Sequence, residues 1–281
     1  MSYQPPFQLT HTMMRHVAYI GELIGLWKAA NQNKLVPELR RGNRIKTIQA
    51  SLAVEQNTLT LEQVTAVIEG KVVLGLPKEI QEVRNAFAAY EVMELWHPHH
   101  IEDLLAAHAL LLHGLIDDAG HWRSKGAGIY RGEQLVHMAP PVSQIARLVA
   151  DLFDWLSHTD AHPLIASAAF HYEFEFIHPF GDGNGRMGRL WQTLILSHWQ
   201  PMLAFLPVET VIKHRQQTYY QLLTESEQKS DCSAFIEFLL QAIEDSLQEA
   251  INTQPDIEQM PVHSPVKTPV QARIQTPNLV L

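Results

Sequence analysis

The chain has 281 residues, of which 46% are hydrophobic, and this is enough for one or two globular domains with a substantial core. Its net charge of −9 argues against broad binding to nucleic acid or to anionic membranes, and a single cysteine excludes an internal disulfide. No run of residues has the length and apolar character of a membrane span. We therefore expect a cytoplasmic protein with no membrane partner.

Helical periodicity dominates the chain. A weakly periodic helix is expected up to about Ala30, and apolar residues spaced three and four apart predict another over about residues 43–56. Thr60 followed by Gln63 has the form of a capping box and predicts a helix that ends at Gly70. Apolar periodicity predicts further helices near residues 80–90, 104–115, 145–155, 164–177, 187–194, 208–222 and 235–243.

Two segments depart from the helical pattern. Residues 121–141 are punctuated by glycines and contain an apolar run at 135–138, which predicts one short β-hairpin. Five of the sixteen prolines follow Asn252, and this composition predicts an extended tail over residues 252–281. The expected fold class is all-α, a helical bundle with one small hairpin.

Residues 178–189 read His-Pro-Phe-Gly-Asp-Gly-Asn-Gly-Arg-Met-Gly-Arg and gather chemically active side chains between two apolar helices. Glycines at 183 and 185 let successive backbone N–H groups point at one spot, and the helix that follows adds its positive end. Arg186 and Arg189 are three residues apart on that helix, so both are expected on one face and within reach of phosphate oxygens.

Two further residues complete this loop. Asp182 offers the kind of oxygen ligand that Mg²⁺ prefers. His178 precedes a proline, which disfavours helical backbone, so it should end its helix and present its side chain at the mouth of the loop. There it could accept a proton from an incoming hydroxyl. A base, a carboxylate and an anion-binding turn in one loop together predict chemistry on a phosphate.

A zinc site is the main alternative for these residues. His171, Glu175 and His178 are spaced i, i+4 and i+7 and could share a helical face. However, Pro179 displaces His178 from the helix, and zinc does not account for Gly-Asn-Gly-Arg-x-x-Arg. The histidines at 97, 99 and 100 are interpreted as a polar loop.

The segment from His178 to Arg189 resembles the signature of the Fic family, His-Pro-Phe-x-Asp/Glu-Gly-Asn-Gly-Arg-x-x-Arg, at every specified position. The similarity extends from about Arg40 to Ile243. It implies a Fic-type helical bundle with a β-hairpin flap. The expected parts are N-terminal helices at 1–100 with an inhibitory helix at about 43–56, a Fic core at 101–251, and the tail.

The resemblance implies transfer of AMP from ATP to a Ser, Thr or Tyr hydroxyl of a target protein or of the enzyme itself. His178 would be the general base, and Asp182 would hold Mg²⁺ bridging the α- and β-phosphates. Arg186 would hold the terminal phosphate, with Arg189 assisting nearby. The anion hole would be formed by Gly183, Asn184 and Gly185.

The resemblance also implies a built-in inhibitor. Many members carry a helix of the form Ser/Thr-x-x-x-Glu-Gly/Asn, which Ser51 and Glu55 match, whereas Gln56 departs from it. We expect Glu55 to pair with Arg186 and so to prevent the terminal phosphate from binding productively. In some relatives this glutamate helps to hydrolyse the protein–AMP bond, so de-AMPylation is a second expected reaction.

Partner and nucleotide contacts are also implied. The flap docks the target by strand addition in this family, and the matching residues are Glu133, Gln134, Leu135 and Val136. Tyr219 and Tyr220 resemble a tyrosine pair near the adenine pocket, with Tyr220 as the candidate contact, although a core role suits either one. Family members often dimerise, so a homodimer is one expected assembly.

Two other functions remain open from the sequence. Some relatives transfer other phosphate-containing groups, but the variant that transfers phosphate itself alters the glycine after Asn184, and Gly185 is intact here. Relatives with similar N-terminal helices often carry a winged-helix domain, which would make the chain a DNA-linked regulator or a toxin–antitoxin component. No helix-turn-helix pattern follows Ile251.

Overall fold

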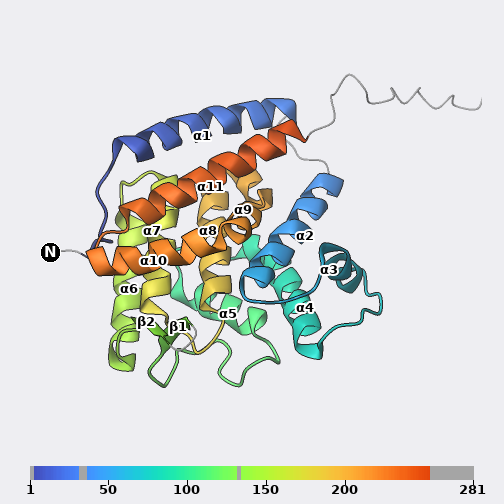
Figure 1. The fold of residues 1–281 in the computed structure, drawn as a ribbon, viewed down its shortest axis with the longest axis horizontal. Helices are drawn as coiled ribbons and strands as arrows, with labels where there is room; N and C mark the ends of the chain where they lie inside the picture. The colour runs from blue at the N-terminus through green and yellow to red at the C-terminus, as the bar shows by residue number, and fades with distance from the viewer. Residues whose placement is uncertain (1–2, 32–36, 132–133, 254–281) are drawn as a thin grey trace, which may run out of the picture.

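The computed structural model describes residues 3–31, 37–131 and 134–253, and most of these are helical (Figure 1). The bounds of the α-helices are α1 His11–Ala30, α2 Pro37–Val54, α3 Leu61–Ile68, α4 Pro77–Val92, α5 Ile101–Leu111, α6 Val142–His158, α7 Pro163–Ile177, α8 Asn184–Trp199, α9 Val208–His214, α10 Gln216–Lys229 and α11 Ser233–Asn252. Two 3-10 helices, η1 Met93–Leu95 and η2 Pro201–Phe205, and the strands β1 Gly128–Arg131 and β2 Gln134–Met138 complete the described elements.

The centre of the bundle is the pair α7 and α8. Nearly every side chain of α7 is buried, as is the greater part of α8, because neither helix has a continuous polar face. The two helices pack against each other, with α6 and α11 against α7 and α5 against α8 (Figure 1). The connection between α7 and α8, which carries the 178–189 sequence, is therefore held by the most enclosed helices of the described residues.

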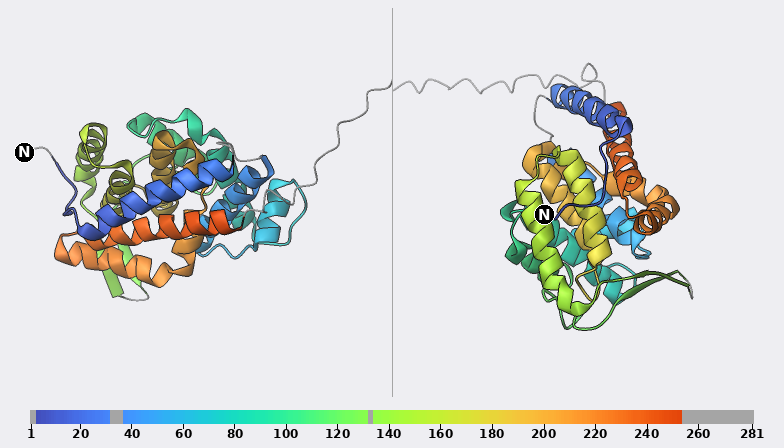
Figure 2. Two further views of the ribbon diagram at one scale, coloured as in Figure 1. Left: turned by 90° about the horizontal axis from the view of Figure 1, so that it is seen from above. Right: turned by 90° about the vertical axis from the view of Figure 1, so that its left-hand side faces the viewer.

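Two layers flank this pair. Helices α1 and α11 run side by side along one edge (Figures 1 and 2), where His16 Nδ1 lies 2.7 Å from Glu244 Oε2. On another side, α2 packs against α4 and α9, and α3 lies against α4. This second layer brings the C-terminal end of α2 to the start of α8.

The helical prediction is confirmed in most elements. Thr60 and Gln63 form the predicted capping box, with both reciprocal hydrogen bonds present. The predicted hairpin is present, its strands antiparallel with a register shift between Ile129 and Tyr130. One prediction is wrong: the helix expected over 208–222 is two helices, because Arg215 leaves helical geometry with φ −113° and ψ 29°. The apolar periodicity continues through this break and does not mark it.

Some expectations lie outside the described residues, namely the tail from residue 254 onward and Glu133 of the flap. The proposed division into segments 1–100, 101–251 and 252–281 stays a prediction. None of the helices in the described ranges combines the length and apolar character needed to cross a membrane.

Candidate active site

His178 ends α7 as predicted. Its backbone has φ 49° and ψ 58°, in the left-handed region, so the chain turns sharply and Pro179 follows outside the helix. Burial lowers the pKa of His178 to about 4, and its Nδ1 has no hydrogen-bond partner in the described structure. The imidazole is therefore neutral near pH 7 and can accept a proton.

The loop after His178 is fixed by two side chains. Asn184 clamps Phe180 reciprocally: its Oδ1 accepts from the Phe180 N–H at 3.0 Å and its Nδ2 donates to the Phe180 carbonyl at 2.9 Å. His108 of α5 stacks on the Phe180 ring with centroids 3.6 Å apart. Because Gly120 N–H donates to His108 Nδ1, the ring proton is on Nε2, which donates to the Asp182 carbonyl at 3.0 Å.

His108 is one of several functional residues that the sequence did not reveal. It stood out only as a histidine in an otherwise leucine-rich helix face. Arg123 is another: its Nε donates to the His178 carbonyl at 2.8 Å, and its guanidinium also bonds the Pro140 carbonyl at the base of the hairpin. His137 of β2 donates from Nε2 to the Phe176 carbonyl at 2.8 Å, and its Nδ1 contacts Glu227. The hairpin is thus attached to the end of α7, beside His178.

Helix α8 begins where an anion would be favoured. Gly183 caps it with φ 82°, a conformation that suits glycine, and a Cβ there would lie 2.6 Å from the Leu112 side chain. The first N–H groups of a helix have no partner within the helix, and they carry its positive dipole end. Asn184 and Gly185 open this helix, which is where the sequence predicts an anion hole, and that role stays a prediction.

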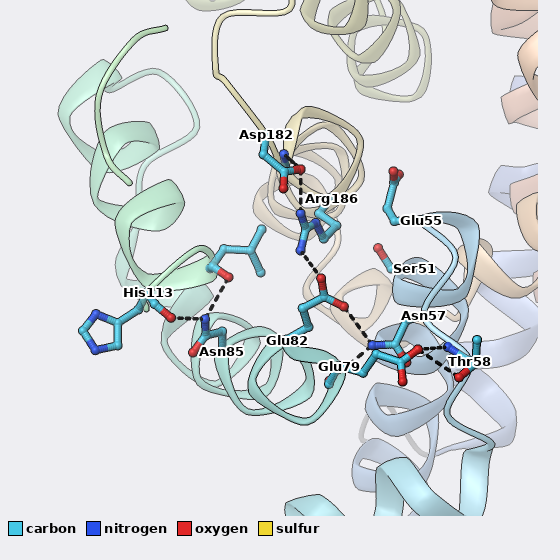
Figure 3. A network of polar contacts seen from close by, with 12 residues as sticks. Ser51, Glu55, Asn57, Thr58, Glu79, Glu82, Asn85, His113, Asp182 and Arg186 are labelled. Atoms are coloured by element: carbon cyan, nitrogen blue, oxygen red, sulfur yellow. Dashed lines mark hydrogen bonds and ion pairs between the residues drawn. The ribbon is translucent and has the colours of Figure 1, made fainter. Parts of the chain in front are cut away.

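Arg186 lies beneath this helix start and is buried (Figure 3). Its Nη2 donates to Asp182 Oδ1 at 2.9 Å, and its Nη1 lies 3.4 Å from Glu82 Oε1 of α4. Its Nε is buried and has no hydrogen-bond partner among the described residues. A buried arginine donor without a partner is costly, and an anion brought beside it would supply one.

Arg189 is more deeply buried and faces α2. Its Nε donates to Ser51 Oγ at 3.0 Å, and its Nη2 donates to the Ser51 carbonyl at 3.0 Å and to Glu55 Oε1 at 2.7 Å. Its Nη1 is buried, and the part of the chain that the structure describes supplies no partner for it. Burial alone would lower the pKa of Arg189, but the neighbouring Glu55 carboxylate more than offsets this and raises it.

The predicted pairing of Glu55 with Arg186 is wrong. Glu55 pairs with Arg189, whereas Arg186 is bonded to Asp182 and Glu82. Three residues of α-helix turn through about 300°, so the two arginines point about 60° apart. This difference is enough for Arg189 to face α2 and for Arg186 to face α4.

The Glu55 carboxylate also covers the helix start. A Cβ built on Gly185 would lie 2.3 Å from Glu55 Oε1 and 3.1 Å from Arg189 Nη1. The carboxylate therefore occupies the position that an anion would take above Gly185. Burial raises the pKa of nearby Glu175 to about 8, which makes it neutral near pH 7.

The turn that follows Glu55 shows why the family pattern has Gly or Asn at position 56, where this chain has Gln. The N–H of Gln56 donates to the Ala53 carbonyl and that of Asn57 to the Leu52 carbonyl, each at 3.1 Å. This is the Schellman pattern, in which the residue after the cap adopts left-handed backbone. Gln56 has φ 69° there, so the Gly or Asn of the family pattern reflects a backbone requirement that Gln56 meets with strain.

The zinc alternative is not supported by this geometry. His171 is fully buried, and its two ring nitrogens contact Gln192 Oε1 at 2.7 Å and Tyr219 Oη at 2.8 Å. In the ranges that the structure describes, one group has metal-ligand spacing, the exposed His97, His100 and Asp103. Asp103 already accepts the His97 N–H at 2.8 Å, which fits a loop held at the start of α5.

The two adjacent tyrosines, Tyr219 and Tyr220, have different surroundings. Tyr219 is a core residue bonded to His171. Tyr220 is 36% exposed, and its hydroxyl lies 3.5 Å from the Val54 carbonyl at the end of α2. Its role toward adenine stays a prediction, as do the flap roles of Gln134, Leu135 and Val136, which belong to β2.

Comparison with known proteins agrees with this site. The model of the Fic/DOC family matches residues 98–196, which include the whole loop. A solved Fic family protein from Desulfovibrio desulfuricans G20 is 61% identical, with a TM-score of 0.87 over 89% of this chain and 77% of that one. Fic-1 from C. elegans, at 24% identity and a TM-score of 0.67, shows the same fold.

Curated relatives are similar over a large part of the chain. Protein adenylyltransferase Fic of Nematostella vectensis is 29% identical over 215 residues, 70% of this chain and 46% of that protein. Protein adenylyltransferase fic-1 of Caenorhabditis briggsae is 32% identical over 214 residues, 72% of this chain and 40% of that protein. The chain thus spans about half the length of the curated relatives that it matches.

Proposed function

Because this chain belongs to the Fic family, we propose that it is a protein adenylyltransferase, which transfers AMP from ATP to a Ser, Thr or Tyr hydroxyl of a target protein or of itself. One observation carries the proposal: two buried arginines lie in the first turns of α8, and a carboxylate already occupies the anion position at the start of that helix. ATP phosphates would take the place of that carboxylate.

The proposed reaction assigns a role to each group. His178 Nε2 or Nδ1 takes the proton of the target hydroxyl, and the hydroxyl oxygen attacks the α-phosphorus of ATP. The bond from that phosphorus to the β-bridging oxygen breaks, and pyrophosphate leaves. Arg186 and Arg189 and the first N–H groups of α8 stabilise the charge on the phosphates, which is the dominant contribution in phosphoryl-type transfers.

Asp182 would hold the Mg²⁺ that the family implies. Its side chain is 44% exposed beside the anion position, and a single carboxylate together with phosphates and waters suits this ion. When bound, Mg²⁺ neutralises phosphate charge and aligns the leaving group. The contact with Arg186 uses Asp182 Oδ1, so Oδ2 would be the oxygen offered to the ion.

Glu55 would inhibit this reaction by holding Arg189 and filling the anion position. Its carboxylate is one-third exposed, so it can also face water at the site, which keeps de-AMPylation as a second proposed reaction. The target would dock on the hairpin, which is attached beside His178 through Arg123 and His137. A cytoplasmic location and a homodimer are part of the same proposal.

The decisive experiment measures the intact mass of the wild-type protein, Glu55→Gly and Glu55→Gly/His178→Ala after incubation with Mg²⁺ and each nucleoside triphosphate in turn. We expect Glu55→Gly to gain the mass of AMP with ATP, and the double variant to gain none. A different added mass would reassign the donor. No added mass with any nucleotide would contradict transferase activity.

A further inference from the structure

A chain of partly buried contacts joins the turn after α2 to Arg186 (Figure 3). Glu82 on α4 is its middle member: Oε1 lies 3.4 Å from Arg186 Nη1, and Oε2 accepts a hydrogen bond from Asn57 Nδ2 at 2.9 Å. The side chains of Glu82 and Arg186 are 11% and 5% exposed, so the pair is largely removed from water. Asn57 lies two residues after Glu55, in the same turn.

The turn is bound firmly to α4. Thr58 donates to Glu79 Oε1 from its N–H at 2.7 Å and from its hydroxyl at 2.9 Å. Asn57 Nδ2 also donates to the Glu79 carbonyl at 3.2 Å. The Thr58 N–H lowers the pKa of Glu79, which keeps this carboxylate ionised and accepting. Displacement of the turn would therefore break several hydrogen bonds of buried groups.

The same segment supports the second arginine. Ser51, near the end of α2, accepts two hydrogen bonds from Arg189, one at its hydroxyl and one at its carbonyl. Glu55 differs from both Ser51 and Asn57, because its side chain is 34% exposed and contacts Arg189 through one oxygen. Glu55 can rotate into solvent while Ser51 and Asn57 keep their contacts.

We propose that Glu82 is a positioning residue for Arg186, with Asn57 as its support, and that residues 51–58 remain docked when inhibition is released. Release then consists of the Glu55 side chain leaving Arg189. The segment that inhibits the enzyme is at the same time part of the scaffold that holds both phosphate-binding arginines. This inference rests on the proposed function, because that function assigns the two arginines to phosphates.

The need for Glu82 follows from the charge balance around Arg186. In the resting structure Arg186 has two carboxylate partners, Asp182 and Glu82. If Asp182 were shared with Mg²⁺, Glu82 would keep the guanidinium paired and oriented, with its remaining donors directed to the phosphates. An unpaired guanidinium at this depth is costly, so without Glu82 the Arg186 side chain would reorient.

The test measures the dissociation constant of Mg·ATP by calorimetry in the Glu55→Gly background. We expect Glu82→Ala and Asn57→Ala each to raise it about tenfold, the usual size for a lost charge-assisted hydrogen bond. Glu82→Gln keeps one acceptor and should have a smaller effect. Because Asn57 acts through Glu82, the Asn57→Ala/Glu82→Ala combination should bind no more weakly than Glu82→Ala. The control is Glu94→Gln, an exposed carboxylate just past α4.

Two outcomes would overturn the proposal. Binding in Glu82→Ala that is tighter than, or within about twofold of, the Glu55→Gly value would show that Glu82 does not position Arg186. Additive effects of Asn57→Ala and Glu82→Ala would show that Asn57 does not act through it. Thermal unfolding is recorded for each variant. If Glu82→Ala does not fold, the near-isosteric Glu82→Gln decides, and a dissociation constant no higher than the Glu55→Gly value would overturn the proposal.

The proposed function fails in a different way. A Glu55→Gly protein that binds Mg·ATP but gains no mass contradicts transfer, while the binding series still tests Glu82. A Glu55→Gly protein that does not bind Mg·ATP contradicts both proposals. Ser51→Ala in the same background extends the series to Arg189, because it removes the hydroxyl that accepts from Arg189 Nε. If α2 stays docked, this variant should bind Mg·ATP more weakly than Glu55→Gly alone.

Discussion

Glu55 Oε1 lies 2.7 Å from Arg189 Nη2 and directly above Gly185, so one carboxylate blocks both an arginine and the start of α8. The contact joins a side chain that is 1% exposed to one that is 34% exposed. The pair blocks the anion position, and because Glu55 is partly exposed, rotation of its side chain into solvent would break the contact. The predictions that follow depend on this geometry.

Replacement of Glu55 should activate the enzyme. A charge-assisted hydrogen bond contributes about 1.5–3 kcal/mol, so Glu55→Gly should raise the rate of AMP transfer roughly tenfold or more. Glu55→Gln keeps an acceptor without the charge and should give an intermediate rate. The measurement is incorporation from labelled ATP, and equal rates in wild type and Glu55→Gly would contradict the inhibitory role.

Alanine at position 185 should abolish transfer even when the inhibitor is removed. Its Cβ would occupy the place of the Glu55 carboxylate, and hence the place proposed for phosphate. We expect Glu55→Gly/Gly185→Ala to be inactive and to bind Mg·ATP weakly by calorimetry. Gly42→Ala is the matched control: Gly42 is helical in α2 with nothing within 4 Å of an added Cβ, so activity should persist. Retained activity in the Gly185 variant would place the phosphate elsewhere.

The pH dependence of transfer should reflect the buried state of His178. Burial lowers its pKa from 6.5 to about 4, so the base stays neutral down to acidic pH and is lost only as the pH falls toward that lower value. The pH profile of kcat/KM for Glu55→Gly should therefore have no acidic limb near 6.5. His178→Ala should show no transfer at any pH. An acidic limb at the ordinary histidine value would show that the base is solvated.

Glycine at position 56 should stabilise the protein. Left-handed backbone costs a residue with a Cβ about 1–2 kcal/mol, while glycine loses part of this gain through a more flexible unfolded chain. Gln56→Gly should therefore raise the free energy of unfolding by roughly 0.5–1 kcal/mol. Urea titration measures the change. Gln56→Val should lower the free energy of unfolding, because a β-branched residue tolerates left-handed backbone poorly. A Gly variant less stable than the Val variant would mean that the φ of 69° carries no strain.

The chemistry of the central loop could be predicted because it is local. Pro179 places the end of α7, and the glycines and arginines of 183–189 specify an anion site within one helical turn. The partner of Glu55 could not be predicted in this way. Spacing alone put Arg186 and Arg189 on one face, and only the packing of α2 and α4 decides which arginine each helix meets.

The supporting residues were missed for the same reason. Glu82 is 104 positions from Arg186, and nothing in its own amphipathic helix separates it from an ordinary surface glutamate. His108, Arg123 and His137 likewise act by bonding carbonyls of the 176–182 region from distant segments. Long-range contacts of this kind leave no spacing in the sequence.

Arg123 bonds the His178 carbonyl and the Pro140 carbonyl at once, and His137 ties β2 to Phe176. These contacts hold His137 of β2 and the residues at the base of the hairpin in a fixed relation to His178. On a target segment docked along the hairpin, the acceptor hydroxyl would be chosen by how many residues it lies from the point of attachment. If a target docks in this way, the position of a hydroxyl along the extended strand would decide its modification more strictly than the surrounding side chains.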